Sequence, residues 1–173
     1  LCKFYKKAFV EAKDKGVLLS LHLKATMMKV SDPILFGYAV ETYFANLFQK
    51  HPRELKALGV NARNGLSDIL AKIEQLPAEE QEPLKHDIEG ALSRAAALSM
   101  VNSDKGITNL HFPNDVIVDA SMPAMIRNGG KMWNAQGVAQ DTLAVQPDST
   151  YARIYPVVID FCKKHGAFNP ATM

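Results

Sequence analysis

Residues 17–33, VLLSLHLKATMMKVSDP, place a predicted strand directly before a predicted helix. Over 19–23 every second residue is leucine, and this alternation with polar residues is the period of a half-buried strand. The triplet 31–33, Ser-Asp-Pro, is typical of a helix start, with an N-cap residue and a proline at the first helical position. Helical spacing continues over 34–48. A strand followed by a helix is the repeating unit of α/β proteins, so this stretch favours that class.

Helical patterns also flank this unit on both sides. Residues 1–15 carry apolar side chains on one helical face, and Gly16 stands where a left-handed residue would end the helix. Beyond Pro52, two more helical patterns cover 66–76 and roughly 80–97. Because this region is poor in β-branched residues, we expect it to form a solvated helical layer.

The second half of the chain changes to shorter segments. We expect 98–101 and 107–110 to form strands or hairpin edges, joined by the polar turn 102–106. Segment 115–127 is ambiguous. Valine and isoleucine near its start favour a strand, whereas an internal proline and the Asn-Gly-Gly at 128–130 suit a kinked and capped helix.

The last predicted elements are a short strand and a long helix. Residues 143–146 have strand character, and Asp148 should cap a helix over 149–165 that Pro156 kinks. Strands that alternate with helices over the whole length predict an α/β fold, a layered sheet with helices on both faces and most strands parallel. We expect one partial domain that comprises residues 1–173.

Composition and charge limit the possible functions. The chain has 173 residues, 47% of them hydrophobic and 22% charged, and 20 Lys and Arg nearly balance 18 Asp and Glu. The basic residues are scattered and do not form the basic stripe of a nucleic-acid binder. Charged residues interrupt the longest apolar stretches before they reach the roughly 20 residues that span a bilayer. We therefore expect no nucleic-acid partner and no membrane association.

The chain ends and the two cysteines carry further expectations. The sequence begins with Leu1 inside a helical pattern and stops just after a predicted helix, so we expect an internal piece of a longer protein. No basic-then-apolar signal segment opens it. Cys2 and Cys162 lie far apart and form no CxxC motif. These features predict a cytoplasmic protein in which both cysteines are core residues.

Lys24 is the first candidate for chemistry, because it directly follows the apolar strand. Open α/β sheets bind ligands at the carboxyl ends of their strands. Partial burial at such an edge would lower the pKa of the lysine and suit it to proton transfer. The alternative is that Lys24 only extends from the sheet edge into solvent.

Asp119 is the second candidate, and it competes with Asp115 four positions earlier. Mg²⁺ and Mn²⁺ prefer oxygen ligands and usually take only one or two carboxylates from one segment. Asp119 lies within an apolar run, where a carboxylate needs a cation or hydrogen-bond donors. Asp119 is therefore a candidate metal ligand, whereas Asp115 beside Asn114 resembles a helix cap. The alternative is that backbone amides alone satisfy Asp119.

Common nucleotide and metal motifs are absent from the sequence. GxGxxG, the P-loop and HExxH do not occur, and the five histidines show no metal-ligand spacing. Turn chemistry explains the polar segments 102–106 and 128–130. The methionines within 122–132, close to Trp133, predict a packed core rather than a cofactor site.

Three stretches taken together resemble the monomeric, NADP-dependent isocitrate dehydrogenase family. They are 19–33, LSLHLKATMMKVSDP; 100–103, MVNS; and 106–111, GITNLH, which runs on through Asp115 to Arg127. The tail 166–173, GAFNPATM, is similar to the segment that follows in the family. The likeness covers essentially the whole chain, so it implies an internal piece of a longer enzyme, from the first part of its large α/β domain.

The resemblance implies roles for both candidate residues. Lys24 corresponds to the catalytic lysine of the family, and Asp119, rather than Asp115, corresponds to one of three metal-binding aspartates. NADP and Mg²⁺ or Mn²⁺ are the implied cofactors, isocitrate is the implied substrate, and the implied full-length enzyme is a monomer. The tyrosine that completes the catalytic pair falls a short way past Met173, and the other metal, substrate and NADP residues also lie outside this chain.

These observations predict that the chain is a fragment of an enzyme that oxidatively decarboxylates isocitrate to 2-oxoglutarate. We expect the isolated fragment to be inactive. Two alternatives stay open. One is a different metal-dependent decarboxylating dehydrogenase that uses another hydroxy acid. The other is a non-catalytic α/β interaction module in which Lys24 and Asp119 are structural.

Overall fold

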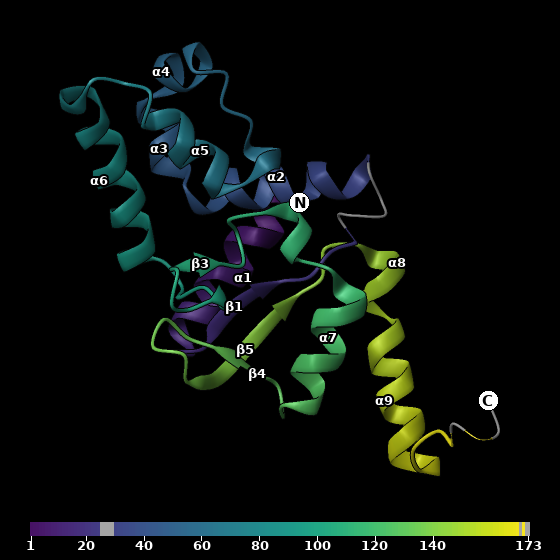
Figure 1. Ribbon diagram of the computed structural model, residues 1–173. Helices are drawn as coiled ribbons and strands as arrows, with labels where there is room; N and C mark the ends of the chain where they lie inside the picture. Colours follow the sequence, from purple (N-terminus) through teal and green to yellow (C-terminus); the bar gives the residue numbers. More distant parts are fainter. Residues whose placement is uncertain (25–29, 170, 172–173) are drawn as a thin grey trace.

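A small sheet lies at the centre of the computed structural model, which describes residues 1–24, 30–169 and 171. The sheet has three strands in the order β1-β5-β4. They are β1 (Leu18–Leu21), β4 (Lys131–Trp133) and β5 (Ala139–Val145). A separate hairpin pairs β2 (Met100–Asn102) with β3 (Ile107–Thr108), as the sequence predicts. The predicted α/β class is confirmed (Figure 1), although segment 25–29 of the quoted motif lies outside the described residues.

The strands do not have the mostly parallel arrangement that we expected. β1 and β5 are parallel, with Leu18 opposite Thr142 and Leu21 opposite Val145. β4 is antiparallel to β5, and β2 is antiparallel to β3. The prediction is therefore wrong for two of the three named pairs in the described residues. The physical reason is loop length, because the short connections within each hairpin cannot make the crossover that a parallel pair needs.

The ambiguous segment 115–127 combines both of its predicted conformations. Ile117 forms an isolated parallel bridge with Leu23, just beyond the end of β1. The Leu23 N–H donates to the Val116 carbonyl at 2.6 Å, and the Val118 N–H donates to the Leu23 carbonyl at 2.7 Å. The chain then turns directly into α7 (Val118–Arg127). Ile117 thus forms a β-bridge, and Val118 begins the helix that ends before the Asn-Gly-Gly turn.

Helices cover both faces of the sheet. On one face, α1 (Cys2–Asp14) buries Tyr5, Ala8 and Ala12 in a large hydrophobic core that includes residues of β1. On the other face, α7 packs over β4 and β5. Successive residues of a strand point to opposite faces. Accordingly, Leu143 contacts the larger core and Ala144 the smaller one.

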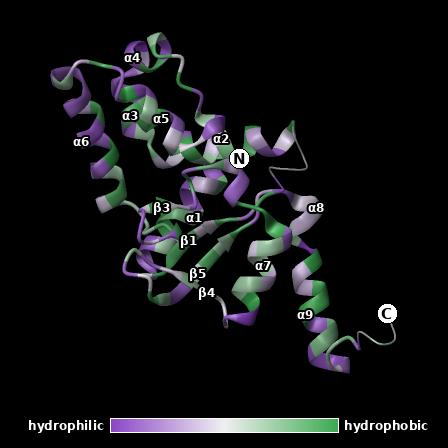
Figure 2. Ribbon diagram, viewed as in Figure 1, coloured by the Kyte–Doolittle hydropathy of each residue, from purple (hydrophilic) through white to green (hydrophobic). Residues whose placement is uncertain are grey.

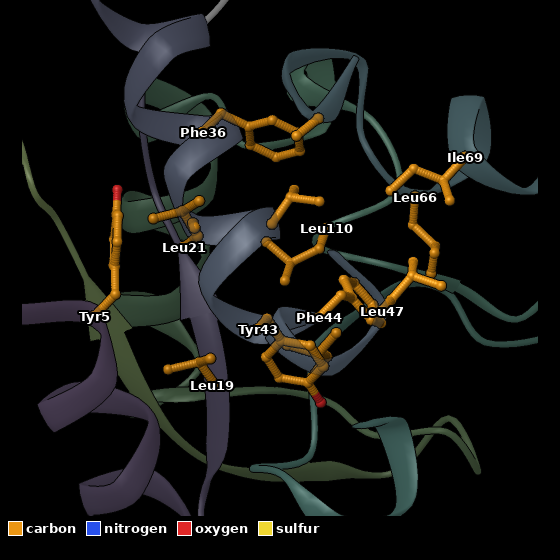
Figure 3. Close-up of a cluster of buried hydrophobic side chains, with 14 of the residues drawn as sticks. Tyr5, Leu19, Leu21, Phe36, Tyr43, Phe44, Leu47, Leu66, Ile69 and Leu110 are labelled. Carbon is orange, nitrogen blue, oxygen red and sulfur yellow. The ribbon is translucent and has the colours of Figure 1, made fainter. Parts of the chain in front are cut away.

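Residues 31–94 form a layer of helices at one end of the molecule (Figure 1). The layer comprises α2 (Ser31–Tyr43), α3 (Ala45–Lys50), α4 (Pro52–Ala57), α5 (Leu66–Ile73) and α6 (Ala78–Arg94), with a 3₁₀ turn at Ala62–Asn64. It is less solvated than we expected, because Leu66, Ile69 and Ile73 of α5 are buried in the larger core. Figure 3 shows Leu66 gathered with Phe44, Leu47 and Leu110.

The helix after the first strand begins earlier and ends sooner than predicted. α2 starts at Ser31 with Val30 as its N-cap, so Ser31 is not the cap and Pro33 is not the first helical residue. The continuous helix expected over 34–48 is interrupted at Phe44, which separates α2 from α3. Phe44 is fully buried, so packing of its ring accompanies the break.

Two further helices close the chain, α8 (Ser149–Ala152) and α9 (Ile154–His165). The Asp148 cap is confirmed, since its carboxylate accepts from the Thr150 N–H at 2.9 Å. The predicted kink at Pro156 is replaced by a break at Arg153. Pro156 falls in the first turn of α9, where a missing N–H costs no helical hydrogen bond. Figure 2 shows hydrophobic stretches along α9, which buries none of its described residues.

Some core assignments from the sequence need correction. Met122 and Met125 are buried as expected, but Trp133 is exposed. Cys2 is exposed and Cys162 only half-buried, so the expectation that both are core residues is wrong. Cys2 occupies the first turn of α1, and Cys162 belongs to the helix without buried residues. Among the described helices, none combines the length and hydrophobicity needed to cross a bilayer.

Candidate functional site

Lys24 is anchored by its backbone where the first strand ends. Its N–H donates to the Asp32 carboxylate at 2.6 Å, and Asp32 is completely buried near the start of α2. The Ser31 hydroxyl donates to the other oxygen of Asp32 at 3.2 Å. The side chain of Lys24 is 20% exposed and extends from the sheet edge. Strand β1 and helix α2 together therefore set the position from which the ammonium reaches the site.

The structure brings Asp119 to Lys24. Asp119 lies in the first turn of α7, and its Oδ2 is 3.4 Å from the Lys24 Nζ. The bridge between Leu23 and Ile117 explains this proximity, because each site residue follows closely on one partner of that bridge. The Asp119 side chain is 43% exposed, although most of its neighbours in the sequence are apolar.

Asp115 takes a different place. It ends the 3₁₀ turn Pro113–Asp115, and α7 has Ile117 as its N-cap with no capping side chain. The expected helix-cap role of Asp115 is therefore wrong. Burial raises the pKa of the Asp115 carboxyl above its usual range.

Tyr151 completes the group of side chains around Lys24, and the sequence analysis missed it. The Tyr151 hydroxyl donates to Asp119 Oδ1 at 2.7 Å, and the Lys24 Nζ lies 4.7 Å from the centre of the Tyr151 ring. Tyr151 belongs to α8, which follows β5. Because β1 and β5 are parallel, their carboxyl ends meet at one edge of the sheet. This rule could have placed the residues after both strands in a single site.

The pKa of Lys24 is shifted in the opposite direction from the one that the sequence predicts. Hydrogen bonding with Tyr151 and the negative charge of Asp119 favour the ammonium form, and they outweigh the partial burial of the side chain. The pKa of Lys24 is therefore raised, not lowered as predicted from desolvation. The ring contact acts in the same direction, since an aromatic face attracts a cation.

His22 links the end of β1 to α7. Its Nδ1 lies 2.6 Å from the Ser121 Oγ, whose own proton goes to the Ile117 carbonyl at 2.9 Å. The single hydroxyl proton of Ser121 is thus used, so His22 Nδ1 is the donor. His22 is fully buried, and burial lowers its pKa to about 4. A neutral histidine thereby ties the strand that precedes Lys24 to the helix that carries Asp119.

Asn109 secures β1 from another side. Its side-chain oxygen accepts from the Leu21 N–H at 2.6 Å, and its side-chain nitrogen donates to the Leu21 carbonyl at 3.0 Å. Both backbone groups of Leu21 are satisfied by one buried amide. Asn109 comes from the quoted motif GITNLH, so this segment supports the strand next to the site.

Comparison with known proteins identifies the family. The profile described as "Monomeric isocitrate dehydrogenase" matches residues 1–173. The chain belongs to the monomeric isocitrate dehydrogenase family. It is 53% identical over 173 residues to "Isocitrate dehydrogenase [NADP] 2" of Psychrobacter sp. (strain 13A), and this match covers 100% of the chain and 23% of the relative.

Two further relatives show the same extent of similarity. "Isocitrate dehydrogenase [NADP]" of Azotobacter vinelandii is 56% identical over 163 residues, which are 94% of this chain and 22% of that protein. "Isocitrate dehydrogenase [NADP] 2" of Mycobacterium tuberculosis (strain ATCC 25618 / H37Rv) is 52% identical over 173 residues, 100% of this chain and 23% of that protein. The chain therefore spans about 23% of the length of these isocitrate dehydrogenases.

The geometry can supply one ligand to a divalent cation. Within residues 1–24, 30–169 and 171, no three His, Cys, Asp or Glu side chains form a metal-binding group. Asp119 is accessible, and its Oδ2 lies 3.4 Å from the Lys24 ammonium, so this oxygen could bind a hard cation.

Proposed function

We propose that this chain is a section of an NADP-dependent isocitrate dehydrogenase that converts isocitrate to 2-oxoglutarate and carbon dioxide. Lys24 transfers protons in this proposal, and Asp119 is one ligand of a bound Mg²⁺ or Mn²⁺. The observation that supports it most is the 3.4 Å approach of Lys24 Nζ to Asp119 Oδ2 at the carboxyl edge of the sheet. Membership of a family whose relatives carry that name supports the reaction class.

Lys24 has the protonation state that a proton donor needs. Loss of carbon dioxide from the oxidised substrate leaves a carbon that must accept a proton. The Lys24 Nζ lies 3.4 Å from the carboxylate that would hold the cation, and a lysine ammonium is a proton donor at neutral pH. A lysine held by its backbone to the buried Asp32 keeps this proton in a defined position.

Asp119 contributes charge and one oxygen atom. When a divalent cation is bound, it polarises the hydroxyl and carboxylate groups of the substrate. The carboxylate orients toward such a cation because Tyr151 occupies its other oxygen. None of the described residues is assigned to NADP, which we propose binds to another part of the full-length enzyme. We also propose that this enzyme is monomeric and cytoplasmic.

The experiment compares variants of the full-length enzyme, numbered as in this chain. We expect Lys24→Met and Asp119→Asn to lower kcat/KM for isocitrate at least ~100-fold, because each removes a group that acts on the reacting atoms. The matched controls are Lys163→Met and Asp160→Asn, which alter an exposed ion pair of the same 3.4 Å length on α9. Assays of NADP reduction with Mn²⁺ should leave these controls near wild type.

Two further assays separate the alternatives. Residues 1–173 alone, given isocitrate, Mn²⁺ and NADP, should produce no NADPH, since one metal ligand and one proton-transferring residue are too few. Isopropylmalate and tartrate test whether the full-length enzyme acts on another hydroxy acid. Normal turnover of isocitrate in both site variants would refute the assignment and favour a structural role for Lys24 and Asp119.

A further inference from the structure

We propose that Tyr151 is a positioning residue that sets the orientation of the Asp119 carboxylate and of the Lys24 ammonium. This inference rests on the proposed function, because it concerns the same site. Tyr151 contacts both side chains, because its hydroxyl hydrogen-bonds with Asp119 and with Lys24 and its ring lies against the Lys24 ammonium. The hydroxyl and the ring can be removed in separate substitutions, Tyr151→Phe and Tyr151→Leu.

The hydroxyl contact limits how the carboxylate can rotate. A 2.7 Å hydrogen bond from Tyr151 holds Asp119 Oδ1, which leaves Oδ2 directed at the Lys24 ammonium. The Asp119 side chain is accessible, so without this bond the carboxylate would sample several rotamers. A hydrogen bond to the outer oxygen of a metal-binding carboxylate typically changes metal affinity by roughly 10–100-fold when it is removed.

The ring contact acts on Lys24. An ammonium 4.7 Å from the ring centre is within the range of a cation–π interaction. This contact and the Asp119 charge hold Nζ on the same side of the site. Because the Tyr151 hydroxyl also hydrogen-bonds with Lys24, removal of the hydroxyl should loosen the lysine in part, whereas removal of the ring as well should misplace it.

The position of Tyr151 is itself defined by its neighbours. The Asp148 carboxylate accepts from both the Thr150 N–H and the Thr150 hydroxyl, at 2.9 and 2.7 Å, which fixes the start of α8. Tyr151 then packs against the smaller core. Tyr155 packs there too, but its hydroxyl donates to the Val118 carbonyl at 3.0 Å rather than to a carboxylate. Tyr155 is therefore a matched control, because its hydroxyl also donates a hydrogen bond but to a backbone carbonyl.

The test measures Mn²⁺ binding to the full-length enzyme by electron paramagnetic resonance of free Mn²⁺, with isocitrate present and NADP absent. Tyr151→Phe should weaken Mn²⁺ binding about 10-fold and raise the KM for Mn²⁺ similarly, with kcat restored in large part by excess Mn²⁺. Tyr151→Leu should lower kcat even at saturating Mn²⁺, because it also removes the ring. Tyr155→Phe should bind Mn²⁺ like the wild type.

The outcomes distinguish this inference from the proposed function. If Asp119→Asn binds Mn²⁺ normally, the metal-ligand role itself is wrong. If Asp119→Asn loses Mn²⁺ while Tyr151→Phe matches Tyr155→Phe, the positioning role of Tyr151 is wrong and the proposed function survives. Thermal melting of each variant sets a temperature at which all are folded. A melting temperature lowered equally in both phenylalanine variants, with equal Mn²⁺ affinity, would also overturn the inference.

Discussion

The two hydrophobic cores of the molecule differ in size and in how they meet the site. The larger core joins α1, β1 and helices of the 31–94 layer, and Phe36 and Phe44 at its centre are fully buried. The smaller core has three buried members among the described residues, Val118, Met122 and Met125. Next to it, α9 buries no described residue and exposes several apolar side chains.

The candidate site lies where these two regions meet. Lys24 follows β1, which belongs to the larger core, whereas Asp119 and Tyr151 come from α7 and α8 beside the smaller core. Lys24 thus belongs to the region around the larger core, whereas Asp119 and Tyr151 belong to the region with few buried residues. Regions with few buried contacts open at lower free energy than the whole fold. We therefore expect damage to the smaller core to disturb Asp119 before the protein unfolds.

The largest expected effect is in the larger core. Phe44→Ala should lower the free energy of unfolding by about 4 kcal/mol, because it empties a fully buried aromatic site between α2 and α3. Urea unfolding followed by circular dichroism measures this change. Phe161→Ala on α9 is the matched control, since this ring is exposed. An equal loss in both variants would contradict the contrast between the two regions.

The second effect concerns His22 at the boundary. Its pKa of about 4 in the folded protein lies below its ordinary value of 6.5, so only the neutral form is stabilised by folding. This stabilisation is complete above pH 6.5 and declines as the pH falls toward 4, by about 3 kcal/mol in total. The measurement is the free energy of unfolding against pH.

A control must separate the contribution of His22 to the pH dependence of stability from that of a second histidine, His111. Burial also lowers the pKa of His111, so both contribute to the acid side of the profile. His22→Asn should flatten the decline between pH 6.5 and 4 more than His111→Asn does. The pKa of Asp87 is lowered chiefly by its hydrogen bond with Lys50, so protonation of Asp87 lowers the free energy of unfolding further below pH 4. A profile that His22→Asn leaves unchanged would show that His22 is not buried in its neutral form.

The third effect is local. Met122→Ala should cost about 2 kcal/mol, less than Phe44→Ala, because the smaller core can partly collapse around the space. Hydrogen exchange read by mass spectrometry should increase in peptides of α7, α8 and α9 and stay constant in α2 to α6. Faster exchange in every helix would mean that the two cores unfold as one unit.

The smallest effect is on the outer face of α9. Val157 is 66% exposed, so Val157→Ser in residues 1–173 should change the free energy of unfolding by less than about 0.5 kcal/mol. The same urea unfolding experiment applies. A loss as large as that of Met122→Ala would show that α9 is packed into the smaller core.

Local patterns predicted much of the fold correctly. The alternation around β1, the spacing in α1 and the Asp148 cap each appear in the structure, because they depend on neighbouring residues. The break at Phe44 and the early start of α2 were not predictable in this way. Packing of the Phe44 ring, and the use of Asp32 by the Lys24 backbone, are contacts with distant residues.

The site was predictable in part. Lys24 and Asp119 were singled out from the position of a lysine after a strand and of a carboxylate in an apolar run, and the resemblance implied their roles. Tyr151 was missed because nothing in the residues around it marks it. Its importance comes from the parallel pairing of β1 with β5, which brings the segments after both strands to the same edge.

The sequence by itself indicated most of the longer helices, the strand before Lys24, the family that the chain resembles, and the two residues to suspect. Only the tertiary structure decided that Lys24, Asp119 and Tyr151 touch, that the lysine is held as an ammonium, and that Asp119 is accessible. The reason is physical. Secondary structure follows from interactions between near neighbours, whereas the charge and orientation of a side chain depend on atoms that folding brings from far along the chain.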